Sequence, residues 1–232
     1  MDNYIGISRE EALAETQRFF VKVYNWMSFA LLVTGGVAMW TAMHPDIIRG
    51  IMQNQMVFFG LIIAEFLMVG YLVGWIQKMS AQTATLVFVL YSVLNGLTLS
   101  VIFLLYTAGS IASTFFITAG TFAVMSAYGY FTKSDLTRWG NLLFMGLIGV
   151  IIASVVNMFF HSPALYWFTT YAGVLIFVGL TAYDTQKIKK MNVIGNEGTE
   201  EDKKEAIVGA LILYLDFINL FLLLLRLFGR RR

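Results

Sequence analysis

Seven long apolar runs dominate this sequence of 232 residues. Each holds about 20 residues, and a helix of that length, rising about 1.5 Å per residue, spans the roughly 30 Å hydrocarbon core of a bilayer. Only 13% of the residues are charged, about half the share of an ordinary soluble domain, so the excess apolar surface must face lipid. The sequence predicts an all-α polytopic membrane protein with seven transmembrane helices, near residues 25–43, 56–75, 85–106, 111–131, 141–160, 166–188 and 206–228.

The spans occupy nearly the whole length, so no soluble catalytic or ligand-binding domain is expected. We predict a cytoplasmic N-terminal tail over 1–24, a single membrane domain over 25–228 with a cytoplasmic loop at 189–205, and a basic tail over 229–232. The N-terminal stretch lacks a small-residue cleavage site after an apolar core, so it is not a secretory signal. It is either a polar lead-in or a short surface helix with an apolar face, formed by Ala12, Leu13, Phe19, Phe20 and Val23.

The distribution of Lys and Arg predicts an orientation, because cytoplasmic loops retain positive charge. With the N-terminus in the cytoplasm, eleven of the sixteen basic residues lie on the inner face. Arg49 lies outside, and so do the four arginines at 226 and 230–232 if the last run spans fully. A re-entrant last segment would bring those four inside. We favour seven full spans, because the last run is long enough and the first helices usually set the orientation.

Several classes of site are excluded by composition. The chain has no cysteine, which rules out disulfides, thiol nucleophiles and cysteine-based metal sites. Its two histidines, His44 and His161, lie beside Pro45 and Pro163 in breaks between the apolar runs, so no histidine lies at membrane depth to bind zinc or copper. The net charge of only +2 predicts no nucleic-acid partner, and no cofactor is expected.

Three of the fourteen acidic residues lie inside apolar runs, namely Glu65, Asp184 and Asp216. An acid inside a membrane helix costs a few kcal/mol on insertion scales, so it normally faces a polar interior and marks an ion path, a proton relay or a gate. The alternative is a protonated acid that only hydrogen-bonds a neighbouring helix. These three residues are therefore the candidates for function.

The two aspartates lie on the sixth and seventh runs, which are antiparallel neighbours joined by one loop. Counting from that loop, their depths differ by about 8 to 9 Å at about 1.5 Å per residue, a gap that tilt or a longer loop helix could close. If they meet, they cannot both ionise cheaply, and the pair shares a proton. Such a pair would form a pH-dependent latch between two helices.

Further polar residues could extend this site. Asn219 follows Asp216 by one helical turn and would share its polar face, and Asn95 and Asn157 could add to it or serve only as packing contacts. Oxygen ligands of this kind suit calcium. We expect no stably bound metal, only transient contact of calcium with Asp184 and Asp216, and we take Glu65 and Asn219 as ion-path candidates.

Three stretches of the chain resemble the Bax inhibitor family, also called the transmembrane Bax inhibitor motif family, in its bacterial branch. They are AYDTQKIKKM around Asp184, ALILYLDFINLFLLLLRLFG around Asp216, and TAGTFAVMSAYGYFTKSDLTRWG over Thr118–Gly140. The resemblance implies two three-helix layers around a central C-terminal helix, here Ala206–Phe228. It also implies a pH-sensitive calcium leak gated by a hydrogen-bonded aspartate pair, which maps onto Asp184 and Asp216. Glu65 matches an acidic position of the family's second helix only loosely.

Three functions are compatible with these features. The first is a pH-sensitive, calcium-permeable leak in the bacterial inner membrane, gated by the aspartate pair, with calcium as the permeant ion and the bilayer as its setting. Coupled exchange of protons and cations would use the same residues. The second is an interaction protein that modulates a membrane-bound ATP-dependent protease, as some bacterial relatives do, or a stress or cell-death pathway, as eukaryotic relatives do. The N-terminal tail and the loop Thr185–Glu205 would then carry the function, and deletion of the first 17 residues would separate the two.

The third function is an intramembrane aspartyl protease, whose two carboxylates activate water. Those proteases carry Gly-x-Gly-Asp at the second aspartate, whereas Leu213, Tyr214 and Leu215 precede Asp216 here. Serine-elbow and zinc-hydrolase motifs are also missing from the sequence. We therefore expect no enzymatic activity.

Overall fold

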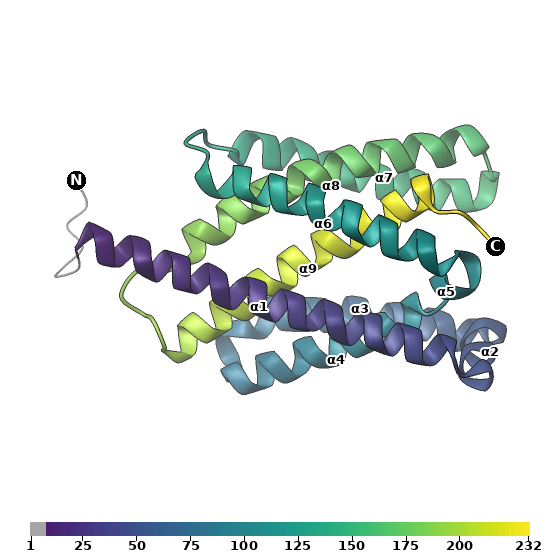
Figure 1. The fold of residues 1–232 in the computed structure, drawn as a ribbon, viewed down its shortest axis with the longest axis horizontal. Coiled ribbons are helices and arrows are strands. Elements are labelled where there is room, and N and C mark those ends of the chain that lie inside the picture. The colour runs from purple at the N-terminus through teal and green to yellow at the C-terminus, as the bar shows by residue number, and fades with distance from the viewer. Residues whose placement is uncertain (1–7) are drawn as a thin grey trace. The chain divides into compact units, whose positions relative to one another are not determined.

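A computed structural model describes residues 8–232, and these form helices joined by short connections (Figure 1). Helix α1 begins at Arg9 because Ser8 caps it. The Ser8 Oγ accepts from the backbone N–H of Glu11, and the Glu11 carboxylate accepts from the N–H of Ser8, which is a reciprocal capping box. The elements are α1 (Arg9–Ala42), α2 (Pro45–Gln53), α3 (Gln55–Trp75), the 3-10 turn η1 (Ile76–Lys78), α4 (Ala81–Leu99), α5 (Ile102–Leu105), α6 (Ala108–Phe131), α7 (Thr137–Phe160), α8 (Pro163–Met191) and α9 (Glu200–Phe228).

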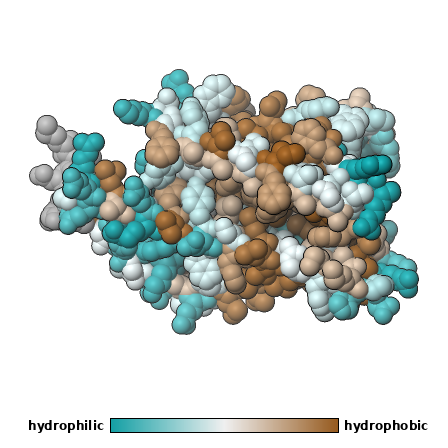
Figure 2. Space-filling model, viewed as in Figure 1, coloured by the Kyte–Doolittle hydropathy of each residue, from teal (hydrophilic) through white to brown (hydrophobic). Residues whose placement is uncertain are grey.

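Within the described residues, seven helical segments are long and apolar enough to cross a membrane, which confirms the predicted fold class. On the face that Figure 2 shows, hydrophobic residues gather along the middle of the helices and hydrophilic residues toward their ends. Helix α9 is the most buried of the seven segments, since 67% of the residues in its apolar stretch of 18 residues are buried. In the corresponding stretch of α7, 0% are buried. The two-layer arrangement that the resemblance implies stays a prediction.

The helices extend further than the apolar runs predict. Residues 9–24 of the predicted tail are the first turns of α1, where Phe19, Phe20 and Val23 are buried, and residues 1–7 lie outside the described part. The predicted loop 189–205 shrinks to 192–199, because α8 continues to Met191 and α9 begins at Glu200. Charged residues there still form regular helix, which a hydropathy scan does not detect.

Two compact units make up the chain. Of the described residues, the first unit contains 8–105 and 189–214, and the second contains 106–188 and 215–232. In the first unit, α1 packs along α4, and Gly96 permits the contact because a Cβ there would lie 2.8 Å from the Thr34 carbonyl oxygen. In the second unit the hydrophobic core joins α8 and α9 through Ile176, Phe177, Leu180, Leu220 and Leu224.

Candidate intramembrane aspartate site

Asp184 of α8 and Asp216 of α9 are hydrogen-bonded to each other within the second unit. Asp216 is buried, with only 5% of its surface exposed. A hydrogen bond between two carboxyl groups requires that one of them carry the proton. The two aspartates therefore meet in the structure, as the family resemblance implies.

The estimated difference in depth does not prevent this contact. That estimate assumed that both helices start from one loop and run side by side, but residues 200–214 of α9 pack in the first unit. Only from Leu215 onward does α9 belong to the unit that contains α8 up to Ile188. Residue counts from the loop therefore do not measure depth from a common plane.

A short chain of hydroxyl groups lies next to Asp184. Thr185 donates to the carbonyl oxygen of Thr181 at 2.7 Å, so the 2.8 Å contact between the Ser126 and Thr185 hydroxyls has Ser126 as donor. Thr181 in turn donates to the carbonyl oxygen of Phe177 at 2.8 Å. All three hydroxyl residues are buried, so their hydrogen bonds hold α6 against α8 without unmet donors.

Helix α6 approaches the backbone of α8 closely at this level. A Cβ placed on Gly129 would overlap the carbonyl oxygen of Ala182, two residues before Asp184. Glycine is thus required here for close helix packing, as at small-residue contacts in membranes generally. The contact fixes the position of the α8 backbone that carries Asp184.

Aromatic side chains surround the α9 segment that carries Asp216. The Phe217 ring meets Phe115 and Phe122 of α6 edge-on, with centroids 5.4 and 5.5 Å away, and Phe221 lies 6.3 Å from Phe115. Such rings contribute large apolar area and no polar partner. They form an apolar contact between α6 and α9 next to Asp216.

Lys187 is a basic group close to the pair. It follows Asp184 by three residues on α8, is exposed, and interacts electrostatically with both aspartates. Sequence reasoning counted Lys187 only for orientation, although the spacing i, i+3 on a helix was a usable signal. Lys187 partly offsets the negative charge that appears when the shared proton leaves.

Glu65 lies in the first unit, at the middle of α3. Its Oε1 accepts from the Thr98 hydroxyl of α4 at 2.6 Å, and the side chain is half-buried. Asn95 and Tyr91 lie about one and two turns before Thr98 on α4, and Asn95 donates to the Tyr91 hydroxyl at 3.3 Å. The Asn95 Oδ1 atom has no hydrogen-bond partner among the described residues. Glu65 thus joins a polar stripe of α4 that supplies several oxygen atoms.

Two of the predicted amide side chains, those of Asn219 and Asn157, hydrogen-bond to backbone groups within or next to their own helices. Asn219 donates to the carbonyl oxygen of Leu215 at 2.8 Å, so its amide hydrogen bond does not reach Asp216. Asn157 accepts from the N–H of Ser162 at 2.8 Å and caps the end of α7, where His161 takes a left-handed φ of 50°. Of the two alternatives open for Asn157, a structural contact is therefore the one observed, because its side chain binds the backbone at a helix end.

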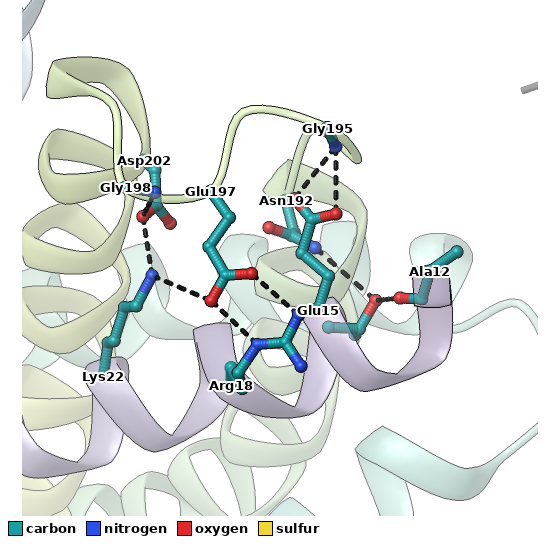
Figure 3. A network of polar contacts seen from close by, with 10 residues as sticks. Ala12, Glu15, Arg18, Lys22, Asn192, Gly195, Glu197, Gly198 and Asp202 are labelled. Atoms are coloured by element: carbon teal, nitrogen blue, oxygen red, sulfur yellow. Dashed lines mark hydrogen bonds and ion pairs between the residues drawn. The ribbon is translucent and has the colours of Figure 1, made fainter. Parts of the chain in front are cut away.

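A network of charges ties the loop 192–199 to α1 in the first unit (Figure 3). The Arg18 guanidinium binds the Glu197 carboxylate through two hydrogen bonds of 2.8 Å, and buried Glu15 accepts from the N–H of Gly195 at 2.9 and 3.0 Å. Gly195 has a φ of +94°, which favours glycine. Sequence reasoning did not find this network, because it pairs residues about 180 positions apart.

The Arg18 hydrogen bond lowers the pKa of Glu197 below its usual range. A carboxyl group whose pKa is lowered by folding stabilises the folded state at pH values above its ordinary pKa of about 4.3. This stabilisation is lost as the pH falls through the lowered pKa of the folded state. The ion pair is exposed, so its effect on stability is small. It should remain intact throughout the physiological range.

The ion pair of Lys22 contributes more to stability than that of Arg18, because its partner is buried. Its Nζ atom lies 2.7 Å from Asp202, whose side chain is only 2% exposed. We expect Lys22→Met to lower the unfolding free energy by about 2 kcal/mol. The cost of leaving a buried charge unpaired is about 3 to 5 kcal/mol, and we discount it because Lys22 is 34% exposed. Thermal unfolding in detergent, followed by tryptophan fluorescence, would measure this.

The matched control is Lys203→Met, which removes an exposed lysine next to Asp202 in the sequence. It should leave the unfolding midpoint unchanged. Equal midpoints for the two variants would mean that the Lys22 contact contributes no stability.

Among the described residues, no group of three or more His, Asp or Glu side chains is arranged to hold a metal ion. The aspartate pair offers two carboxyl groups, which is fewer than the six to eight oxygen ligands that calcium prefers. This arrangement suits transient contact better than stable binding.

The seven apolar helices of the described residues and the hydrogen-bonded carboxyl pair define a polytopic helical membrane protein. The chain matches the family model described as "Inhibitor of apoptosis-promoting Bax1" over residues 16–232 and therefore belongs to the Bax inhibitor family. It is 53% identical over 220 residues to the "Inner membrane protein YbhL" of Escherichia coli, covering 94% of each chain. It is also 50% identical over 215 residues to a protein of Borreliella burgdorferi, covering 93% of each, and 36% identical over 227 residues to one of Deinococcus radiodurans, covering 98% and 96%.

Proposed function

We propose that this protein is a pH-sensitive, calcium-permeable leak of the bacterial inner membrane, with its N-terminus in the cytoplasm. The observation that carries the proposal is the hydrogen-bonded pair of Asp184 and Asp216 inside two membrane-spanning helices. The location is supported by the similarity to the inner membrane protein YbhL of Escherichia coli. The protein acts passively and uses no cofactor or catalytic residue.

The pair couples protonation to helix packing. While it shares one proton, the two carboxyl groups attract each other and join α8 to α9. When that proton leaves, two like charges face each other in an apolar setting and repel, and the Lys187 ammonium offsets part of this repulsion. The contact between α8 and α9 therefore has two arrangements whose balance depends on pH, which is what a gate requires.

Glu65 is the candidate cation-attracting group of the first unit. We expect Glu65→Gln to lower calcium entry into liposomes about threefold to tenfold at every pH. The amide can still accept from Thr98, but it cannot attract a cation, and loss of about 0.7 to 1.4 kcal/mol of attraction gives this change in rate. The ratio of fluxes at two pH values should stay as in the unaltered chain, because the aspartate pair remains.

Asp46→Asn is the control for Glu65→Gln, because Asp46 lies on α2 outside the seven spans. Its flux should match that of the unaltered chain. A Glu65→Gln flux that also matches would remove Glu65 from the ion path.

A second candidate function is a protein that binds and restrains a membrane-bound ATP-dependent protease. The loop 192–199 favours it, because Arg18 and Glu15 of α1 bind Glu197 and Gly195 of the loop and hold it in one conformation. Deletion of residues 1–17 would remove Glu15, which binds this loop. Deletion of residues 1–7 keeps the Ser8 cap and all these contacts, so it is the cleaner test of whether the N-terminal tail binds a partner. If it does, this deletion should weaken partner binding and leave the calcium flux unchanged.

A further inference from the structure

The end of the second unit at which α9 terminates is strongly basic. Four arginines lie there, at positions 226, 230, 231 and 232, and all are exposed. Three stretches contribute to this end, 106–120, 155–170 and 220–232, and none of them contains Asp or Glu. The charge of the four guanidinium groups is thus not neutralised by side chains of these stretches.

Hydrogen bonds fix the residues after α9 onto the start of α6. The N–H of Thr107 donates to the carbonyl oxygen of Arg230 at 3.1 Å, and the N–H of Arg230 donates to the Ser110 hydroxyl at 2.9 Å. Tyr106 and Arg231 form an antiparallel bridge. The basic tail is therefore held in place at the end of the helices.

Tyrosine side chains orient two of the arginines. The Arg226 guanidinium lies over the Tyr166 ring, 4.9 Å from its centroid, and the Arg231 Nη2 donates to the Tyr166 hydroxyl at 3.2 Å. Arg231 also hydrogen-bonds to Tyr106. Each of these contacts leaves other N–H donors of the guanidinium fork free, and the Arg230 side chain makes no hydrogen bond or ion pair within residues 8–232.

The position relative to the bilayer restricts which anion could meet these donors. Arg226 lies in the last turn of a membrane-spanning helix, and Tyr166 and Trp167 lie in the first turns of α8. Tyrosine and tryptophan at helix ends typically lie at the level of the lipid headgroups. A guanidinium group can donate two parallel N–H hydrogen bonds to two oxygens of one phosphate group.

We propose that the arginines at 226 and 230–232, with Tyr166, form a binding surface for the phosphodiester headgroup of an anionic phospholipid. Bound lipid would anchor the end of α9, the helix that carries Asp216. The inference does not depend on the calcium leak, because it concerns charge and hydrogen-bond donors at the other end of the second unit from Asp184.

The test uses the full chain purified in detergent, offered equal amounts of phosphatidylglycerol and phosphatidylcholine in mixed micelles. Native mass spectrometry measures the ratio of the two lipids that stay bound. We expect the unaltered chain to prefer phosphatidylglycerol, and Arg230→Gln/Arg231→Gln/Arg232→Gln to weaken that preference on the order of 100-fold, since each surface cation contributes about fivefold.

Two further variants make the result specific. The triple lysine variant, Arg230→Lys/Arg231→Lys/Arg232→Lys, keeps the charge and should keep most of the preference, which also shows that the altered tail still folds. Lys133→Gln/Arg138→Gln removes exposed charges from the connection between α6 and α7 and the start of α7 and should keep the preference. An unchanged ratio in the triple glutamine variant, or an equal loss in the Lys133/Arg138 variant, would overturn the proposal. Release of the lipid by inorganic phosphate at equal concentration would also overturn it in favour of a free-anion site.

Discussion

Asp216→Asn should flatten the dependence of calcium entry on pH. We expect the flux of the unaltered chain to change by about tenfold between about pH 5 and pH 8, and that of the variant by less than about twofold, where tenfold corresponds to about 1.4 kcal/mol. Asparagine has the shape of aspartate and can still hydrogen-bond to Asp184. It cannot ionise, so loss of a proton from Asp184 no longer places two like charges together.

The control for this variant is Glu201→Gln, which makes a comparable carboxyl-to-amide change on the same helix at an exposed position. It should retain the pH dependence of the unaltered chain. Asp184→Asn should reproduce Asp216→Asn, because both remove one member of the pair. A steep pH profile in both aspartate variants would rule the pair out as the sensor.

Gly129→Ala should be among the most destabilising single substitutions in this chain. The added methyl group would overlap the carbonyl oxygen of Ala182, which is backbone and cannot rotate away. Overpacking usually costs about 1 to 3 kcal/mol, and we expect the upper end or more here. That corresponds to a fall of about 10 °C in the unfolding midpoint, measured by tryptophan fluorescence in detergent.

Gly120→Ala on the same helix is the matched control. Position 120 has open space around it, and alanine favours helix over glycine by about 1 kcal/mol, so this variant should be as stable as the unaltered chain or more so. Similar midpoints for the two alanine variants would show that α6 and α8 do not approach as closely as described. Because Ala182 lies two residues before Asp184, Gly129→Ala should also alter the pH profile of calcium entry.

The fold was largely predictable because hydropathy reports directly on membrane spans. The seven apolar runs match seven helical segments, with ends set by Pro45, Pro163 and the Ser8 cap. The amphipathic helix α2 between the first two spans was not predicted. Charged helical turns, such as those of α1 before Asn25 and of α9 before Ala206, carry no hydropathy signal and were assigned to tail and loop instead.

The aspartate pair could be predicted as candidates, because a membrane acid is costly wherever it lies. Their contact could not be derived from residue counts, since it depends on where α9 leaves one unit and enters the other. The family resemblance supplied that pairing. Contacts such as Glu15 with Gly195, or Arg226 with Tyr166, join residues distant in sequence, and no local pattern indicates them.

The most direct test is calcium entry into liposomes that contain the purified, unaltered protein, recorded with an internal calcium-sensitive dye over a series of pH values. Empty liposomes of the same lipid composition give the background. We expect entry above that background, with a rate that changes with pH. Entry no faster than in empty liposomes at every pH would contradict the proposed leak and leave the protease-binding function as the better explanation.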